Sequence, residues 1–456
     1  MRVTPDIPLS LYEIAAAINS KALAVSNKYI KAVCTDTREA EENDLFVALS
    51  GEKGDGEEYI EEAKKKNCFP ISARSRDGAL KVEDTASALL DLAKYYKSKL
   101  NTKYTVAVTG SVGKSTTVKF LKKILAQKYK VHTPIGNFNN HIGVPLTVLS
   151  APRDTEIIIC ELGMNHRNEI SRLSKCINPD IGIITSVGSA HIGNLGSREE
   201  IARAKLEILD GMNGGALILP KNEPLLSNVE NAYRVGYNTS LSHFYLTSAN
   251  GNCSVIFKGE TIKELNFFNN RNHLIADLSY AISVAVMLDM SENEIRKGIE
   301  SIDDNDLRQR FIPFKDFTVF DDSYNASVES MVADFKYISS LNKPTGAFLG
   351  DILELGEASK RIHETIGERA AEFNVGNLYL YGVYAKDTER GAIRGGMDPK
   401  SIHVNTDISS PEISIAQILS NHKDGEIILF KASHKLRLDK IADIIKEKEG
   451  MSNERS

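Results

Sequence analysis

Residues 106–120 read VAVTGSVGKSTTVKF, and this stretch decides how the rest of the chain is interpreted. An apolar run with strand character leads into a turn that holds Gly110 and Gly113, and a segment suited to a helix follows. This order is typical of a phosphate-binding loop, because backbone N–H groups and the positive end of a helix dipole then face phosphate oxygens. The usual spacing G-x-x-x-x-G-K-[ST] would place its first glycine at Ala107, inside the predicted strand. A turn that merely joins strand to helix is the alternative, but G-K-S-T-T directly after an apolar strand favours a nucleotide site.

The loop predicts ATP as the cofactor. Lys114 is expected to reach the β- and γ-phosphates, and the hydroxyl of Ser115 is expected to bind Mg²⁺. The glycines let the backbone approach the phosphates closely. The predicted ATP contacts within the loop are Gly110, Ser111, Val112, Gly113, Lys114, Ser115 and Thr116.

Apolar runs alternate with helical segments over most of the chain, which is typical of α/β domains. Near the loop, "YTVAVTG", "EIIICELG" and "IGIITSVG" are continuous apolar strands, and they predict a parallel sheet covered on both faces. Because 456 residues exceed one ordinary core, we predict several domains. They are a small N-terminal α/β domain (1–102), a central P-loop parallel-sheet ATPase domain (103–310) and a C-terminal Rossmann-like α/β domain (311–456).

The composition is that of a soluble globular protein, with 42% hydrophobic and 26% charged residues and a net charge of −5. Lys and Arg are interspersed with Asp and Glu, so we expect no nucleic-acid partner. No apolar run is long enough for a membrane span, and the N-terminal stretch is no signal peptide, so we expect a cytoplasmic protein. The 5 cysteines show no C-x-x-C pairing and are interpreted as reduced, mostly buried thiols.

The loop "TGSVGKST" resembles that of the Mur ligases, in which the shorter form T-G-x-x-G-K-[ST]-[ST] explains Ala107. Further motifs of that family follow in the expected order along nearly the whole chain. They are "CTDTREAEENDLFVALSGEKGDGEEYI" (34–60), "GNFNNHIGVPLTVL" (136–149), "ELGMNHRNEI" (161–170), "AHIGNLGSREEIARAKLEI" (190–208), "DDSYNASVESM" (321–331) and "LGDILELGEASKRIHETIG" (349–367).

The resemblance implies an ATP-dependent amide ligase of peptidoglycan precursor synthesis, acting through an acyl phosphate and forming ADP and phosphate. Its motifs are most similar to the branch that adds D-alanyl-D-alanine to a UDP-N-acetylmuramoyl-tripeptide. The implied partners are ATP, Mg²⁺ and these two small-molecule substrates, and we expect a monomer. The first domain would bind the UDP-sugar, the second ATP, and the third would complete the ligase site.

By the same resemblance, Lys114, Glu161, His191 and Lys205 are the expected catalytic residues. Mg²⁺ would be held by Ser115, Glu161, His191 and a carbamylated Lys205, because a carbamate presents oxygens where an ammonium cannot ligate a cation. Three of these residues also have an alternative structural interpretation. Glu161 could be a helix cap, His191 a structural histidine, and Lys205 a helix-surface lysine near Glu207.

Other expected contacts also come from the resemblance. The nucleotide would further contact His273, Arg308, Asp322, Tyr324 and Asn325. The substrates would contact Thr37, Arg38, Asn137, Asn139, Asn140, Lys431 and Ser433, although the asparagines could equally be turn formers. Asp351 and His363 lie in a matching stretch but receive no catalytic role.

Several residues that the motifs of this family usually carry are replaced in this chain. The positions are Ser186, Leu206, Leu274, Asp277, Ser327, Val328 and Ala432. Two alternatives stay open: a divergent Mur-type ligase joining a different amine or carboxylate in another pathway, and a catalytically inert relative that binds nucleotide or UDP-sugar and acts as a regulator. Retention of the predicted metal and phosphate residues argues against the inert relative, and an amine panel would separate the two ligases.

Overall fold

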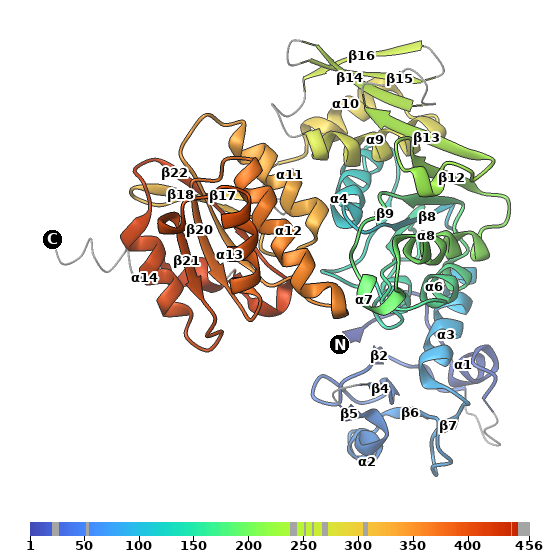
Figure 1. Ribbon diagram of the computed structural model, residues 1–456. Coiled ribbons are helices and arrows are strands. Elements are labelled where there is room, and N and C mark those ends of the chain that lie inside the picture. Colours follow the sequence, from blue (N-terminus) through green and yellow to red (C-terminus); the bar gives the residue numbers. More distant parts are fainter. Residues whose placement is uncertain are drawn as a thin grey trace.

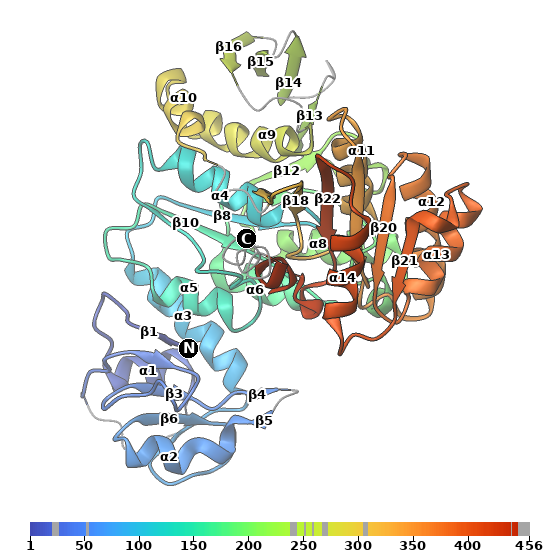
Figure 2. The same cartoon turned by 90° about the vertical axis from the view of Figure 1, so that its left-hand side faces the viewer.

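The computed structural model folds into three α/β units, which Figures 1 and 2 show side by side with the central unit between the other two. It describes residues 1–20, 27–51, 54–237, 244–249, 252–257, 260–266, 272–303, 309–438 and 440–445. The α/β class and the central parallel sheet around the phosphate loop are confirmed. The sheets fall within the predicted segments apart from Arg310, which begins the first strand of the third sheet; the boundaries at 102 and 310 stay predictions.

The N-terminal unit has a sheet in the order β1-β2-β3-β6-β7, parallel except for β1. Its strands are Arg2–Val3, Val33–Cys34, Leu45–Val47, Phe69–Ser72 and Leu80–Lys81, and β4 (Ser50–Gly51) pairs with β5 (Gly54–Asp55) beside it. Its helices are α1 (Leu11–Ala17), α2 (Ile60–Lys65) and α3 (Thr85–Lys99). Helix α1 begins where Ser10 and Glu13 form a capping box, which satisfies N–H groups that the first turn leaves free.

The central sheet has the order β16-β15-β14-β13-β12-β11-β8-β10-β9. From β9 to β14 it is parallel, and β15 and β16 continue it antiparallel. The strands are β8 (Tyr104–Thr109), β9 (Val131–His132), β10 (Ile157–Glu161), β11 (Ile181–Ile184), β12 (Ala216–Pro220), β13 (Ala232–Tyr237), β14 (Phe244–Ala249), β15 (Asn252–Phe257) and β16 (Glu260–Asn266). The last five of these strands follow one another between residues 216 and 266.

Helices cover both faces of this sheet because side chains alternate along its strands. Val106 and Val108 of β8 point into a core that also contains Phe120 and Leu278, whereas Ala107 points into the opposite core. The first face is covered by α4 (Lys114–Leu125), α9 (Asn272–Met287) and α10 (Glu292–Glu300). The second is covered by α5 (Gly143–Leu149), α6 (Glu169–Ile177) and α8 (Arg198–Leu206). A short helix, α7 (Ile192–Leu195), precedes α8.

The C-terminal unit has a sheet in the order β17-β18-β22-β19-β20-β21, in which β22, the last strand of the chain's described part, lies in the middle. Only β17 is antiparallel to its neighbour. The strands are β17 (Arg310–Pro313), β18 (Phe317–Asp321), β19 (Thr345–Gly350), β20 (Asn377–Tyr381), β21 (Ile402–Asn405) and β22 (Glu426–Lys431). The helices are α11 (Val328–Ser339), α12 (Ser359–Glu372), α13 (Ala385–Arg394) and α14 (Pro411–Asn421).

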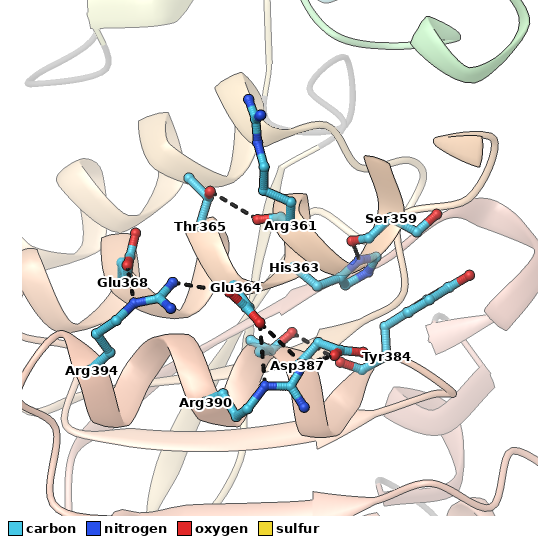
Figure 3. A network of polar contacts seen from close by, with 11 residues as sticks. Ser359, Arg361, His363, Glu364, Thr365, Glu368, Tyr384, Asp387, Arg390 and Arg394 are labelled. Carbon is cyan, nitrogen blue, oxygen red and sulfur yellow. Dashed lines mark hydrogen bonds and ion pairs between the residues drawn. The ribbon is translucent and has the colours of Figure 1, made fainter. Parts of the chain in front are cut away.

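Helices α12 and α13 are joined along their exposed faces by ion pairs (Figure 3). Arg390 contacts Glu364 at 3.1 Å, and Arg394 contacts Glu364 at 3.1 Å and Glu368 at 2.6 Å. Beneath them, the ring of His363 stacks on Tyr384 at 4.7 Å. Exposed ion pairs contribute little each, so the apolar core under these helices provides most of the packing energy.

The N-terminal and central units share one core. Helix α3 packs on α5 and α6, and its buried Leu92 and Tyr96 belong to the same apolar cluster as Leu146 and Leu173. The Tyr96 hydroxyl donates to the carbonyl oxygen of Ala151 at 2.9 Å and accepts from N–H groups near the N-terminus. Among the helices that the structure describes, none combines the length and apolarity needed to cross a membrane.

Candidate active site

The phosphate loop connects the carboxyl end of β8 to the first turn of α4, as predicted. Gly113 caps α4 with φ +87°, a left-handed conformation that favours glycine. Space also demands glycine there: a Cβ on Gly113 would lie 2.3 Å from Oδ1 of Asp277, and one on Gly110 would lie 1.9 Å from Oγ1 of Thr185.

Strand order places this loop where ligands bind in α/β sheets. β8 lies between β10 and β11, so the strand order reverses beside it, and open α/β sheets bind ligands at the carboxyl end of such a point. Glu161 ends β10 at that edge, and Thr185 and Ser186 directly follow β11.

Two predicted metal ligands meet under the loop. The Ser115 hydroxyl donates to the carboxylate of Glu161, which is 6% exposed. Asn139 Nδ2 donates to the other oxygen, Oε1 of Glu161, at 3.0 Å. Glu161 is thus an oriented, nearly buried oxygen donor and not a helix cap. The ammonium of Lys114 folds back over the loop and donates to the Gly110 carbonyl at 2.7 Å.

Lys205 is buried, contrary to the alternative of a surface lysine. It belongs to α8 and is only 2% exposed. Burial, and secondly the charge of Lys114, hold the pKa of the Lys205 amine well below its usual value. A lowered pKa favours the neutral, nucleophilic amine, which is the form that reacts with CO₂.

His191 lies at the boundary between the central and C-terminal units. It precedes α7 with φ +65°, and its Nδ1 is 2.7 Å from Oε2 of Glu354. The hydrogen bond to His191 lowers the pKa of Glu354. Within the ranges that the structure describes, no three His, Cys, Asp or Glu side chains converge into a metal site. The geometry therefore joins Ser115 with Glu161, while the bond of His191 goes to the neighbouring unit.

In the C-terminal unit, Asp322 and Lys431 are brought together at the carboxyl ends of β18 and β22. Lys431 is 1% exposed; its ammonium pairs with Asp322 and lies 2.7 Å from Oδ2 of Asp334. Burial opposes the charge on Lys431, but the two carboxylates outweigh it and raise its pKa. Gln309 Nε2 donates to Oδ1 of Asp334 at 2.9 Å. The buried Lys431 ammonium is thus held by the carboxylates of Asp322 and Asp334.

The remaining predicted residues of this unit lie in adjoining loops. The ring of Tyr324 is 5.1 Å from that of His434, and the side-chain oxygen of Asn325 accepts from the N–H of Ala326. Ser433 Oγ accepts from the N–H of Leu353 at 2.9 Å, which ties this loop to the one after β19.

Asp351 and His363 form hydrogen bonds within the C-terminal unit. The Asp351 carboxylate accepts from the N–H groups of Val383 and Tyr384, and His363 Nε2 accepts from the N–H of Ile352 at 3.0 Å.

In the N-terminal unit, Thr37 is 5% exposed, and its carbonyl oxygen accepts from Lys66. Arg38 is exposed and paired with Asp36. In the loop before α5, Asn137 is exposed and the Asn140 side chain caps the helix through the N–H groups of residues 142 and 143. Arg308 and the side chain of His273 lie outside the described residues.

Most of the replaced motif residues have structural explanations. Ser186 Oγ accepts from the Val112 N–H at 2.9 Å and donates to its carbonyl at 3.0 Å, so it fastens the phosphate loop. Leu274 is a core residue, and Ser327 caps α11. Ala432 is fully buried against Gly350, where a built Cβ would come within 2.7 Å of the alanine methyl. These replacements reflect local packing.

Sequence reasoning missed Thr185, Glu354, Asp334 and the contact of Asp277 with the loop. Thr185 follows the apolar strand "IGII" at the same sheet edge as Glu161, so position along the strand was a usable signal. The others contact the site from distant elements, and no local pattern marks them.

Comparisons with known proteins agree with this geometry. Residues 108–272 match the Mur ligase middle domain. The UDP-N-acetylmuramoyl-tripeptide–D-alanyl-D-alanine ligase of Bacillus subtilis is 33% identical over 90% of this chain and 92% of that protein. A crystal structure of MurF from Acinetobacter baumannii is 26% identical, with a TM-score of 0.88 over 97% of this chain and 100% of that one. MurF from Thermotoga maritima in complex with ADP shares the fold at 24% identity, with a TM-score of 0.78 over 92% and 98% of the two chains. The chain therefore belongs to the Mur ligase family and, within it, to the group of the UDP-N-acetylmuramoyl-tripeptide–D-alanyl-D-alanine ligases.

Proposed function

We propose that this protein is the ATP-dependent ligase that joins D-alanyl-D-alanine to a UDP-N-acetylmuramoyl-tripeptide in peptidoglycan precursor synthesis. The observation that carries the chemistry is the contact of Ser115 with the oriented carboxylate of Glu161 beneath a loop that holds Lys114. The named relatives, aligned over nearly the whole chain, support the choice of substrates. A cytoplasmic location is part of this proposal, supported by the need for ATP and a nucleotide-linked precursor.

The reaction needs no nucleophilic side chain. A carboxylate oxygen of the tripeptide forms a bond to the γ-phosphorus of ATP, and the bond from that phosphorus to the β–γ bridging oxygen breaks to release ADP. The amine nitrogen of D-alanyl-D-alanine then attacks the acyl carbon, phosphate leaves with the electron pair of the C–O bond, and the amine loses a proton. Because anions must meet in the first step, Lys114 and the N–H groups of the loop stabilise the transferring phosphoryl group.

Mg²⁺ is the metal that this site fits. The Ser115 hydroxyl and the Glu161 carboxylate are hard oxygen donors beside the phosphate loop, and Asn139 orients the carboxylate. The cation would neutralise charge on the β- and γ-phosphates. We further propose that Lys205 becomes carbamylated, supported by its burial and its lowered amine pKa. His191 stays a predicted ligand, held by Glu354 in this structure.

The decisive experiment measures phosphate release with ATP, the UDP-tripeptide and a panel of amines. We expect release to need both substrates and to be fastest with D-alanyl-D-alanine. A different preferred amine would identify a divergent Mur-type ligase, and release independent of any amine would rule out ligation. As an internal check, Lys114→Ala should lower turnover by roughly 10² or more, since it removes a charge that stabilises phosphoryl transfer.

Lys205 is tested separately. Lys205→Ala should lose most activity, and short-chain carboxylates such as acetate should restore part of it by placing oxygens where the carbamate stood. Arg203, on the same helix and 72% exposed at its side chain, provides the control, since Arg203→Ala should leave turnover unchanged. Loss of activity that neither bicarbonate nor acetate affects would indicate a role without a carbamate.

A further inference from the structure

The phosphate loop is supported from behind by helix α9, which Figures 1 and 2 show lying along α4. One contact is direct. The Asp277 carboxyl lies against the Cα of Gly113, so that a Cβ built there would be 2.3 Å from Oδ1 and 3.2 Å from Oδ2. The carboxyl therefore fills the space that a side chain at position 113 would need.

A second contact reaches the other end of the loop. The Tyr280 hydroxyl, one turn further along α9, donates to the Thr185 carbonyl oxygen at 2.9 Å. The Thr185 hydroxyl in turn donates to the Val112 carbonyl at 2.5 Å and occupies the space beside Gly110. Helix α9 thus contacts the loop at Gly113 directly and at residues 110–112 through Thr185.

The environment of Asp277 favours the neutral form of its carboxyl. Asp277 is 9% exposed, and burial raises its pKa well above the usual value. The neighbouring Thr117 hydroxyl, in the first turns of α4, is buried and acts in the opposite direction by lowering the pKa of Asp277, but burial outweighs it. A neutral carboxyl adds no negative charge behind a loop that faces phosphates, whereas a carboxylate there would repel them.

We propose that Asp277 is a positioning residue for the nucleotide: its carboxyl holds Gly113, and so the turn from the loop into α4, in the conformation that directs backbone N–H groups at the phosphates. This inference rests on the proposed function only in that the loop binds a nucleotide. The role does not require the Asp277 side chain to touch the nucleotide. An amide has nearly the same shape as the carboxyl and carries no charge, so asparagine should perform this role, whereas alanine should not.

The test measures binding of ADP and of a non-hydrolysable ATP analogue by calorimetry, which needs neither ligase substrate. Asp277→Asn should bind within about threefold of the wild type, and Asp277→Ala at least tenfold more weakly. Leu278→Ala, which truncates a neighbouring buried side chain of α9, is the control. It should lower the melting temperature but leave nucleotide affinity within about twofold.

A double-mutant cycle tests the contact itself. Gly113→Ala should weaken nucleotide binding at least fivefold more in the wild type than in Asp277→Ala, because removal of the carboxyl frees the space of the added methyl. Equal effects in both backgrounds, or Asp277→Ala binding as tightly as the wild type, would overturn the proposal. A wild-type protein that bound no nucleotide would instead contradict the proposed function.

Discussion

The two junctions that flank the central unit are built from different chemistry. On the N-terminal side the core is continuous, and Leu92 and Tyr96 of α3 share one apolar cluster with Leu146 and Leu173. On the C-terminal side Ile192 packs on the neighbouring core, and polar contacts accompany it. Glu329 accepts from the Ser189 N–H at 2.9 Å, Glu354 contacts His191, and the carbonyl oxygen of Glu354 accepts from the Gly193 N–H at 3.2 Å.

The apolar and polar junctions should differ in how easily they open. Separating an apolar interface exposes surface at about 25 cal/mol per Å², whereas polar groups exchange their partners for water at little net loss. We therefore expect the first two units to behave as one body and the C-terminal unit to change position, as in enzymes whose domains close on substrates.

The largest effect is expected when the units are expressed separately. Residues 311–456 should fold alone, because all fully buried members of their two apolar cores come from this segment. Residues 1–102 alone should fail to fold cooperatively, because α3 would lose the residues that complete its core. Circular dichroism during urea unfolding measures both. A cooperative transition in the 1–102 fragment would contradict a shared core.

Truncation within the apolar junction should have the next largest effect. Tyr96→Ala removes a fully buried ring and its hydrogen bond to Ala151, and should lower the free energy of unfolding by about 3–5 kcal/mol. Tyr12, 64% exposed on the same unit, is the matched control. Tyr12→Ala should change the free energy by no more than about 0.5 kcal/mol, and similar losses in both variants would remove Tyr96 from the junction.

The polar junction should respond differently. Glu354→Gln should leave the melting temperature nearly unchanged, because the Glu354 side chain is 50% exposed and such pairs contribute about 0–1 kcal/mol. Its effect should appear as a larger radius of gyration in X-ray scattering without ligands. Glu357→Gln, an exposed neighbour, should not change the radius. Indistinguishable scattering from all three proteins would show that Glu354 does not help hold the junction.

The smallest expected effect is a loss of folding stability at acid pH. Hydrogen bonds from Lys99 of α3 and then from Ser10 lower the pKa of Glu13 from 4.5 to about 2. A lowered pKa in the folded state adds stability above the unfolded value of 4.5, and this stability is lost as pH falls toward 2. Since Glu13 is 28% exposed, the contribution should be about 1 kcal/mol or less. Urea unfolding at pH 6 and pH 3 should show a smaller loss for Glu13→Gln than for the wild type, and equal losses would remove Glu13 from the acid response.

Local patterns predicted the fold and part of the site. Strand β8, the glycine turn and α4 are contiguous, so their signals lie together in the sequence, and Glu161 is marked by the end of an apolar strand. The burial of Lys205 could not be read from α8, whose sequence also suits an exposed helix. Glu354 lies 163 residues from His191, and Asp277 approaches Gly113 from a helix far along the chain. Such contacts depend on how units pack, which periodicity does not record.

The central position of β22 has a consequence for protein synthesis. On the ribosome, β17 and β18 emerge early and β19 to β21 follow, but they cannot form one sheet until the strand between them, residues 426–431, has been made. A chain that terminates before residue 426 would carry two incomplete half-sheets with unpaired edges, and unpaired edges promote aggregation. It would also lack Lys431, whose charge offsets the buried carboxylates of Asp322 and Asp334. Only a chain translated past residue 431 can assemble the third unit, so chains that terminate earlier would present quality-control proteases with an unfolded C-terminal segment.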